Sequence, residues 1–345
     1  MKKNLMIMCM ALFAMLLATT GGFAQLPPPL PASCGTYAVL PTGANVAPTA
    51  TNMRIAVAAN FYGPVQNLLN AYLPTLKQAT TATVCSNATG TFEKDINENY
   101  PTYIYDLFFA ADDSVTQYTS AENCSTSNVP CAVDDDAFLY ANGIPVLFGY
   151  VAPSLNSNIA NLITDVSYLI TQSGSNFQNV LAYSVPGSAN GYQIATPTAN
   201  TVAIADPGVA PYGLKAATIL SNMYSVPLPN PLNASNLPQF GSVSLNTATG
   251  QDVGATFNLV GTGSTFSGFV GKSQICSILP IVAYVQFPNY TLQQYAVQFD
   301  TSNNVATALN AYIQQYMMVT PDPAVSALMK WDVFLVNNCY QPLPH

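Results

Sequence analysis

The sequence predicts an α/β protein of two lobes, each built on an open sheet flanked by helices. Short, almost entirely apolar runs alternate with segments whose apolar residues recur at helical spacing, which is typical of strands and helices in an α/β sheet. A polar stretch interrupts this alternation of strands and helices, which resumes after it. The chain of 345 residues is also longer than a single core would comfortably hold. These three observations together indicate two lobes.

The first lobe is expected to begin with a strand over residues 53–59. This run is apolar except for Arg54, as in a strand covered on both faces of a parallel sheet. Apolar residues then follow helical spacing up to Leu76. Asp112 and Asp113 are good helix caps and predict a further helix start. The other elements expected here are strands over residues 82–86 and 103–110 and a helix over residues 91–97.

The middle and the end of the chain repeat this alternation, which implies a second lobe. Between residues 225 and 250 the composition turns to Pro, Asn, Ser and Thr, and this stretch predicts a long surface excursion. The strands expected in these parts cover residues 137–150, 201–205, 283–287 and 292–299, and the helices cover residues 155–171, 213–223, 305–317 and 323–331.

The N-terminus has the pattern of a secretory signal peptide. Lys2 and Lys3 precede an apolar run over residues 5–18, and small residues close the segment at residues 22–24. The run is short for a membrane span, and no cationic stop signal follows it. We therefore expect a signal peptide over residues 1–24 and a mature protein in the periplasm or outside the cell. Residues 25–51 are rich in Pro, Thr and Ala without a period and are expected to form an extended leader.

The cysteines indicate disulfides rather than metal or thiol chemistry. The chain has 7 cysteines, and Cys9 lies in the signal peptide, which leaves an even number for an oxidising compartment. Many pairings are open. Cys124 with Cys131 is the pair that looks locally plausible, because the loop between them is short and rich in Ser, Asn and Pro.

The scarcity of charge excludes several functions. Charged residues make up 7% of the chain, and the 8 Lys and Arg face 16 Asp and Glu. Nucleic acid is not expected as a partner, because clustered cations carry affinity for it. The single histidine is His345, so we expect neither an imidazole-based catalytic triad nor a histidine metal cage. The acidic residues 134–136 lack the spacing of a calcium loop and are expected to be solvated. We predict no enzyme activity, no metal cation and no cofactor.

Five segments, read in order, resemble the periplasmic molybdate-binding family, whose members are solute receptors of ABC importers. The most specific is Tyr-Asp-Leu-Phe-Phe-Ala-Ala-Asp at residues 105–112, which matches the family's Asp-hydrophobic-Phe-x-Ala-Asp strand end. The others are Ile-Ala-Val-Ala-Ala-Asn-Phe at 55–61, Asn-Ala-Thr-Gly-Thr-Phe at 87–92, Phe-Leu-Tyr-Ala-Asn at 138–142 and Ile-Ala-Asp-Pro-Gly-Val-Ala-Pro-Tyr-Gly at 204–213, with a weaker sixth, Gly-Phe-Val-Gly-Lys-Ser-Gln, at 268–274.

This resemblance implies the type II periplasmic-binding-protein-like fold, in which two lobes with open mixed sheets are linked by two crossovers and hold the ligand in the cleft between them. It implies a first lobe over residues 52–140 and 275–345 and a second lobe over residues 141–274. It also implies a passive receptor, expected to be a monomer, whose closed form an ABC permease in the membrane recognises.

The resemblance further implies a site for a small tetrahedral oxyanion, expected to be molybdate or tungstate. Such an anion accepts hydrogen bonds at each oxygen, so neutral donors and helix starts can hold it. The corresponding positions provide one side-chain amide, two hydroxyls and one backbone N–H, in Asn60, Thr89, Tyr140 and Ala210. The neighbours expected to contribute are Ala59, Phe61, Ala88 and Tyr212.

Each expected ligand residue also has a structural interpretation. Asn60 could turn the chain, Thr89 could cap a helix and Tyr140 could belong to the core. The family commonly has two serines where this chain has Ala88 and Thr89, so one hydroxyl donor is absent. The Pro-rich leader, the extra cysteines and the polar excursion also fit a secreted protein that uses the fold for another ligand or for a host or surface interaction.

Overall fold

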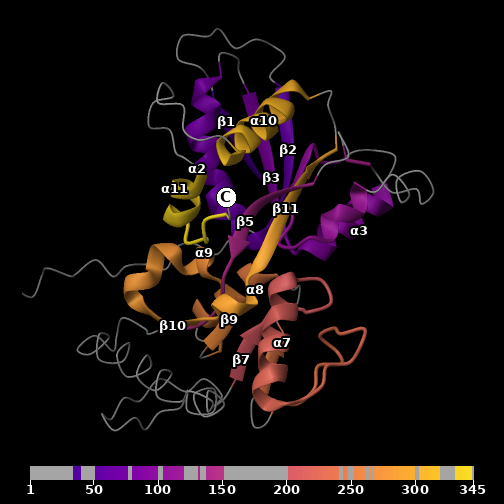
Figure 1. The fold of residues 1–345 in the computed structure, drawn as a ribbon, viewed down its shortest axis with the longest axis vertical. Helices are drawn as coiled ribbons and strands as arrows, with labels where there is room; N and C mark the ends of the chain where they lie inside the picture. Colours follow the sequence, from indigo (N-terminus) through magenta and orange to yellow (C-terminus); the bar gives the residue numbers. More distant parts are fainter. Residues whose placement is uncertain are drawn as a thin grey trace, which may run out of the picture.

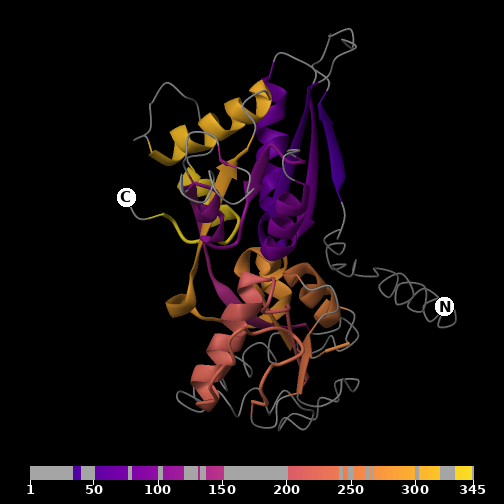
Figure 2. The same cartoon turned by 90° about the vertical axis from the view of Figure 1, so that its right-hand side faces the viewer.

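The chain forms two mixed sheets, each flanked by helices and stacked along the long axis of the molecule (Figures 1 and 2). The predicted fold class, α/β with two open mixed sheets, is therefore confirmed. The computed structural model describes residues 34–39, 51–76, 80–99, 104–119, 131–132, 137–150, 201–240, 244–247, 252–261, 264–265, 267–299, 303–318 and 331–343.

The first sheet is built around β2 (Thr51–Ala58), which the apolar run at its centre predicts. β2 pairs in parallel with β3 (Thr80–Asn87) on one side and with β4 (Leu107–Phe109) on the other. The antiparallel strands β11 (Leu292–Gln298) and β5 (Phe138–Gly143) follow β4, and β1 (Gly35–Val39) forms the opposite edge. The strand order is β1-β3-β2-β4-β11-β5.

The second sheet has the same plan without the extra edge strand. Its central strand β7 (Thr201–Ile204) pairs in parallel with β8 (Ser244–Thr247) and β9 (Ser267–Gly271). The antiparallel strands β6 (Pro145–Tyr150) and β10 (Val282–Gln286) follow β9. β11 therefore enters the first sheet from the second lobe, and β6 enters the second sheet from the first lobe.

Two crossovers join the lobes. β5 leads into β6 across Ile144, and β10 leads into β11 through the 3-10 turn η8 (Pro288–Tyr290); Figure 2 shows both connections between the lobes. The single strand expected over residues 137–150 is therefore wrong, because its two halves pair in different sheets. Pairing also displaces the expected lobe boundaries: residues 141–143 stay in the first sheet, and residues 282–286 lie in the second.

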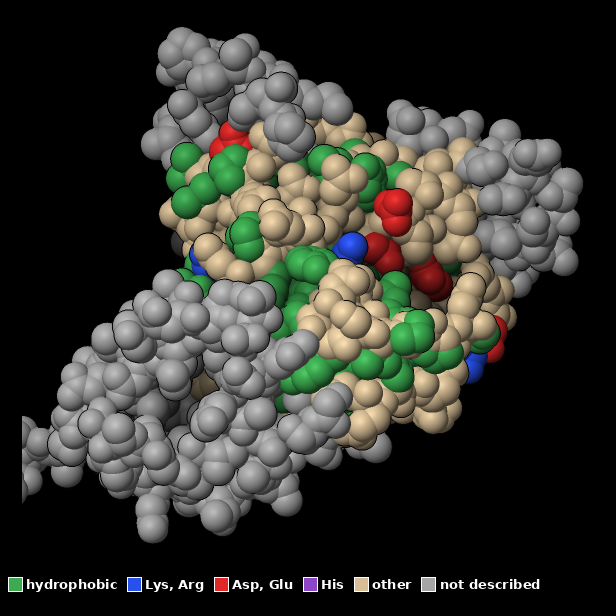
Figure 3. Space-filling view, turned by 60° about the horizontal axis from the view of Figure 1, so that its bottom comes forward, with side chains coloured by type: hydrophobic (Ala, Val, Ile, Leu, Met, Phe, Trp, Pro, Cys, Tyr) green, Lys and Arg blue, Asp and Glu red, His purple; other side chains and the backbone are tan. Residues whose placement is uncertain are grey.

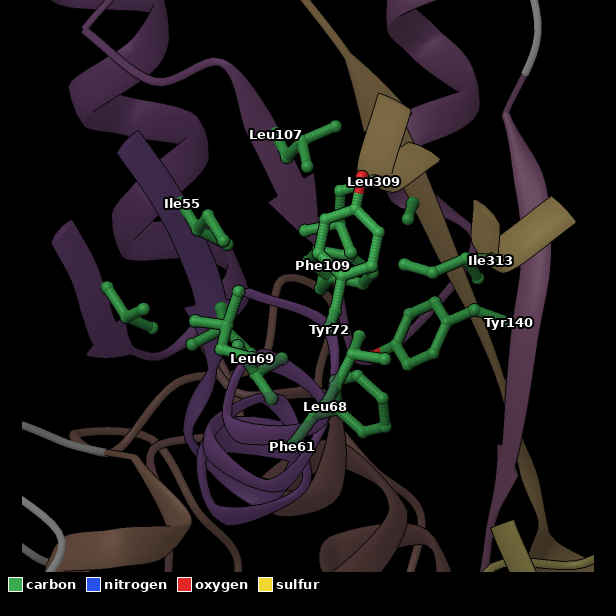
Figure 4. Close-up of a cluster of buried hydrophobic side chains, with 14 of the residues drawn as sticks. Ile55, Phe61, Leu68, Leu69, Tyr72, Leu107, Phe109, Tyr140, Leu309 and Ile313 are labelled. Atoms are coloured by element: carbon green, nitrogen blue, oxygen red, sulfur yellow. The ribbon is translucent and has the colours of Figure 1, made fainter. Parts of the chain in front are cut away.

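Helices cover both faces of the first sheet. Alternate residues of β2 enter different cores, with Ile55 and Val57 on one face and Ala56 on the other. The first face packs against α2 (Tyr62–Tyr72), α10 (Asn304–Met318) and α11 (Trp331–Asn337), and Figure 4 shows this core. The second face packs against α3 (Thr89–Asn99) and the 3-10 helix η3 (Ser114–Tyr118).

The second sheet is covered in the same way. α7 (Pro211–Tyr224) packs on one face, and α8 (Val253–Gly261), α9 (Lys272–Ile275) and the 3-10 helix η7 (Cys276–Ile281) pack on the other. The 3-10 turns η1 (Ala59–Phe61) and η2 (Leu73–Thr75) flank α2 in the first lobe. Among the described helices, none combines the length and the apolar character needed to cross a membrane.

Two disulfides are present in the described part of the chain. Cys34, just before β1, is bonded to Cys85 in β3, and Cys276 in η7 is bonded to Cys339 after α11. Cys131 forms no disulfide, and its expected partner Cys124 lies outside the described residues. Disulfides are typical of exported proteins.

Several sequence expectations differ from the structure or fall outside it. Residues 35–39 of the expected leader form β1, because an edge strand can be polar when its ladder is held by pairing with β3. Residues 244–247 of the expected surface excursion form β8 beside β7. The expectations that lie outside the described residues are the signal peptide over residues 1–24, the acidic residues 134–136 and the helices over residues 155–171 and 323–330.

Candidate functional site

Three helix starts meet where the two lobes face each other. η1 follows β2, α3 follows β3 and α7 follows β7, so the ends of three parallel strands point to one junction. The backbone N–H of Gly90 in α3 donates to the carbonyl of Val209 before α7 at 2.9 Å, which joins the lobes directly. Apolar side chains from both lobes, most of them alanines, pack together around this contact and form an alanine cluster: Ala58, Ala59, Ala88, Ala111, Ala205, Ala210, Tyr212, Val253 and Leu292.

A network of uncharged polar groups lies beside the alanine cluster and is centred on Gln294 of β11. The Oε1 atom of Gln294 accepts hydrogen bonds from Asn60 Nδ2 at 3.0 Å and from the hydroxyl of Tyr140 at 2.9 Å. Its Nε2 atom donates to the hydroxyl of Tyr212 at 2.9 Å. Asn60 and Tyr140 belong to the first lobe and Tyr212 to the second. Gln294 therefore connects three expected ligand residues across the junction.

A β-bulge positions Tyr140 in this network. Gln294 pairs with Ala141 and Tyr295 pairs with Leu139, so Tyr140 is an extra residue in β5. A bulge re-aims side chains and releases a backbone group from the ladder. The released carbonyl of Tyr140 accepts a hydrogen bond from the indole Nε1 of Trp331 at 2.7 Å.

The C-terminal residues also reach the network. The amide nitrogen Nδ2 of Asn60 donates to the hydroxyl of Tyr340 at 2.9 Å, and that hydroxyl donates to the carbonyl of Asn60 at 2.9 Å. The hydroxyl of Ser273 in α9 donates to the same carbonyl at 2.8 Å. Asn60 is thus held by the first lobe, the second lobe and the C-terminal segment together.

Burial keeps the tyrosine hydroxyls of the network protonated. Tyr140, Tyr212 and Tyr340 are at most 4% exposed, and this burial raises the pKa of each phenol above its ordinary value of 10.0. A protonated hydroxyl that accepts one hydrogen bond still carries a hydrogen to donate, as Tyr212 does here. The Oδ1 atom of Asn60 is buried and has no hydrogen-bond partner among the described residues.

The remaining expected ligand residues lie at the same junction in different roles. The hydroxyl of Thr89 accepts a hydrogen bond from the N–H of Ala111 at 3.0 Å, and the ring of Phe61 packs 4.5 Å from the ring of Tyr140. The N–H of Ala210, expected to face the anion, donates instead to the carbonyl of Asp206 at 2.8 Å, because the chain turns there before α7. Ala59 and Ala88 present only methyl groups to the cluster.

No charged side chain takes part in the hydrogen-bond network described above. Every hydrogen bond described above links uncharged groups. Burial raises the pKa of Glu93 and of Asp112, which both contact Ser114 in the first lobe. Figure 3 shows one face of the molecule, on which charged side chains are sparse and a few acidic ones gather right of its centre. The described residues contain no group of three or more His, Cys, Asp or Glu able to hold a metal ion.

Sequence reasoning missed three members of the network. Gln294 lies in an ordinary strand, Ser273 in a short helix and Tyr340 near the end of the chain. Neutral side chains in such positions form no motif, and only strand pairing and the C-terminal packing bring them together. The one available signal was the Gly-Lys-Ser-Gln part of the weak sixth segment, which contains Ser273.

The fold and the site together define a two-lobed α/β protein with an uncharged polar site at the junction of its lobes. No protein-family profile matches the sequence, and no curated protein matches it significantly. Solved structures with similar folds include periplasmic substrate-binding proteins. One is the substrate-binding domain assigned to a molybdenum ABC transporter from Clostridium difficile, with 14% identity and a TM-score of 0.45 over 85% of this chain and 99% of that chain.

Two further structures have similar folds. A periplasmic thiamin-binding protein has 10% identity and a TM-score of 0.49, over 87% of this chain and 85% of that chain. The substrate-binding protein of an ABC transporter from Agrobacterium tumefaciens has 13% identity and a TM-score of 0.43, over 87% and 86%. The α/β fold class itself rests on the strand order and pairing described above.

Proposed function

We propose that this protein is an exported solute-binding protein that captures a tetrahedral oxyanion, molybdate or tungstate, between its lobes and delivers it to an ABC importer. The observation that carries the proposal is the meeting of Asn60, Tyr140 and Tyr212 on Gln294 at the junction of the lobes. A site between lobes on two crossovers suits a receptor that closes on its ligand by hinge motion.

Uncharged donors suit this ligand class. A permanently ionised oxyanion accepts hydrogen bonds at every oxygen, and donors fixed in a dry site stabilise it without a counter-ion. The hydroxyls of Thr89 and Tyr212, one in each lobe, each accept one hydrogen bond and so keep a hydrogen to donate. The N–H of Gly90, which donates to Val209, would add a third donor once the lobes separate. A site of this kind would bind weakly any solute that must itself donate most of the hydrogen bonds.

Ligand entry would require the lobes to part. The alanine cluster and the contact from Gly90 to Val209 fill the junction, and the N–H of Ala210 is engaged by Asp206. Opening about Ile144 and η8 would separate these surfaces and expose Thr89 and Tyr212. The ligand would then replace alanine contacts on closure.

Calorimetric titration of the mature protein with molybdate, tungstate, sulfate and phosphate tests the proposal. We expect binding of molybdate and tungstate, weakened roughly tenfold to a hundredfold in Asn60→Ala and in Thr89→Ala, since each variant removes hydrogen bonds from the buried site. Asn67→Ala is a matched control, because Asn67 lies on the exposed side of α2 and bonds to Asn338. Equal weakening in Asn67→Ala would argue against the site.

One observation favours a second candidate, a secreted protein that uses the fold for another ligand or for a surface interaction. Most donors at the junction satisfy one another, and methyl groups fill the space between the lobes. If none of the four oxyanions binds to the wild-type protein, the transport proposal fails and this candidate replaces it.

A further inference from the structure

We propose that Gln294 is a positioning residue that makes the junction site selective for anionic ligands. This inference rests on the proposed function, because it concerns the same site. Gln294 is fully buried and lies on β11, the strand that returns from the second lobe to the first. It hydrogen-bonds to three expected ligand residues, and no other side chain in the described network hydrogen-bonds to Asn60, Tyr140 and Tyr212 together.

The carboxamide matters because it both accepts and donates. Its oxygen holds Asn60 and Tyr140, and its nitrogen donates to the oxygen of Tyr212. Because Tyr212 accepts this hydrogen bond, its own hydroxyl hydrogen is directed away from Gln294 and remains available for a hydrogen-bond acceptor. A carboxylate at the same position could only accept, so it would turn the hydrogen of Tyr212 towards itself.

The neutrality of Gln294 matters as much as its geometry. A negative charge at this fully buried position would repel an anion across a short, poorly screened distance. A cationic ligand would instead gain a partner. Glutamine thus combines the shape that connects the residues with the absence of the charge that would exclude an oxyanion.

A second buried glutamine on the same strand makes it possible to distinguish this role from the effect of burial alone. Gln298 is on the same strand and is 4% exposed, and its side chain bonds to Thr307 and Asn310 of α10 at 2.7 and 2.9 Å. These partners belong to the first lobe, away from the junction. Gln298 therefore provides a matched control for the same substitutions in the same strand.

The experiment compares Gln294→Glu with Gln298→Glu by calorimetric titration with molybdate and tungstate between about pH 6 and pH 9, where wild-type binding is expected to vary little. We expect Gln294→Glu to weaken binding more than about a hundredfold at the high end of this range. The affinity should recover as the pH falls and the new carboxyl group is protonated. Gln298→Glu should change the affinity less than about threefold and without this pH profile.

A second variant covers the case in which Gln294→Glu does not fold. Gln294→Met keeps the length and neutrality of the side chain but removes its hydrogen bonds, so it should weaken binding at all pH values equally, whereas Gln298→Met should not. Wild-type-like binding by a folded Gln294→Glu or Gln294→Met variant would overturn the inference and leave the proposed function intact. Absence of oxyanion binding by the wild-type protein would overturn both.

Discussion

The disulfide between Cys276 and Cys339 is expected to hold the C-terminal segment to the second lobe and thereby to stabilise the junction. Cys276 lies in η7, between α9 and β10 of the second sheet. Cys339 follows α11, whose Trp331 and Phe334 are in the core of the first lobe. The bond is therefore a third covalent connection between the lobes, in addition to the two crossovers, and it lies next to Tyr340 of the polar network.

The magnitude follows from the length of chain that each disulfide closes. Cys276 and Cys339 are 63 residues apart, and Cys34 and Cys85 are 51 residues apart. Loop-closure entropy gives about 4 kcal/mol of stabilisation for either bond. The double variants Cys276→Ser/Cys339→Ser and Cys34→Ser/Cys85→Ser should thus lose similar free energies of unfolding in urea. The second pair serves as a control, because it lies within the first lobe, with Cys34 just before β1 and Cys85 in β3.

Hydrogen exchange distinguishes the two variants without any ligand. The N–H of Tyr340 donates to the carbonyl of Leu335 at 2.9 Å, and the N–H of Gln341 donates to the carbonyl of Asn142 in β5 at 3.1 Å. Loss of the Cys276–Cys339 bond should accelerate exchange at these two amides, because the segment is then held by non-covalent packing alone. Unchanged exchange there, or the same acceleration in the Cys34→Ser/Cys85→Ser control, would refute the reasoning.

Three further predictions follow from the junction and its surroundings. Gly143→Ala should lower the free energy of unfolding by about 1–3 kcal/mol in urea titrations, because the added methyl group would collide with the hydroxyl of Tyr212; Gly63→Ala, at an open position in α2, is the control. Trp331→Phe should lower the free energy of unfolding by about 2 kcal/mol, because it leaves the buried carbonyl of Tyr140 without its hydrogen-bond donor. Unfolding followed by circular dichroism measures this change. Burial raises the pKa of Asp112 above 3.8, so deprotonation of this carboxyl group costs more in the folded protein than in the unfolded chain and lowers stability as the pH rises. Asp112→Asn should therefore reduce the fall of the urea midpoint with rising pH above about pH 4. An unchanged pH dependence would contradict the burial argument.

Local patterns predicted much of the first lobe. The apolar run at 53–59 and the helical spacing after it correspond to β2 and α2, because both signals depend on neighbouring residues alone. The division at Ile144 could not be read in the same way. β5 and β6 are both apolar and nearly continuous, and only their partners, β11 and β9, place them in different sheets.

The site, like the fold, could be predicted only in part from the sequence. Asn60 and Tyr212 follow strand ends, where open α/β sheets commonly bind ligands, and the resemblance to the molybdate-binding family implied them as site residues. Gln294 and Tyr340 depend on long-range events: the return of β11 to the first sheet and the docking of the C-terminal segment. Neither event leaves a local pattern, because the residues involved are uncharged and stand alone in otherwise ordinary segments.

The bulge at Tyr140 explains why the C-terminal segment belongs to the site. Tyr140 and Ala141 are consecutive residues of β5, yet both are fully buried in the same core, which a regular strand would not allow. The bulge leaves the carbonyl of Tyr140 outside the ladder, and an unpaired buried carbonyl is unfavourable unless a donor reaches it. Trp331 supplies that donor, and Tyr340 follows within the same segment to bond with Asn60. The β-bulge that directs Tyr140 towards Gln294 therefore depends on the C-terminal segment, which also fixes Asn60. The positions of Tyr140 and Asn60 are coupled through this segment.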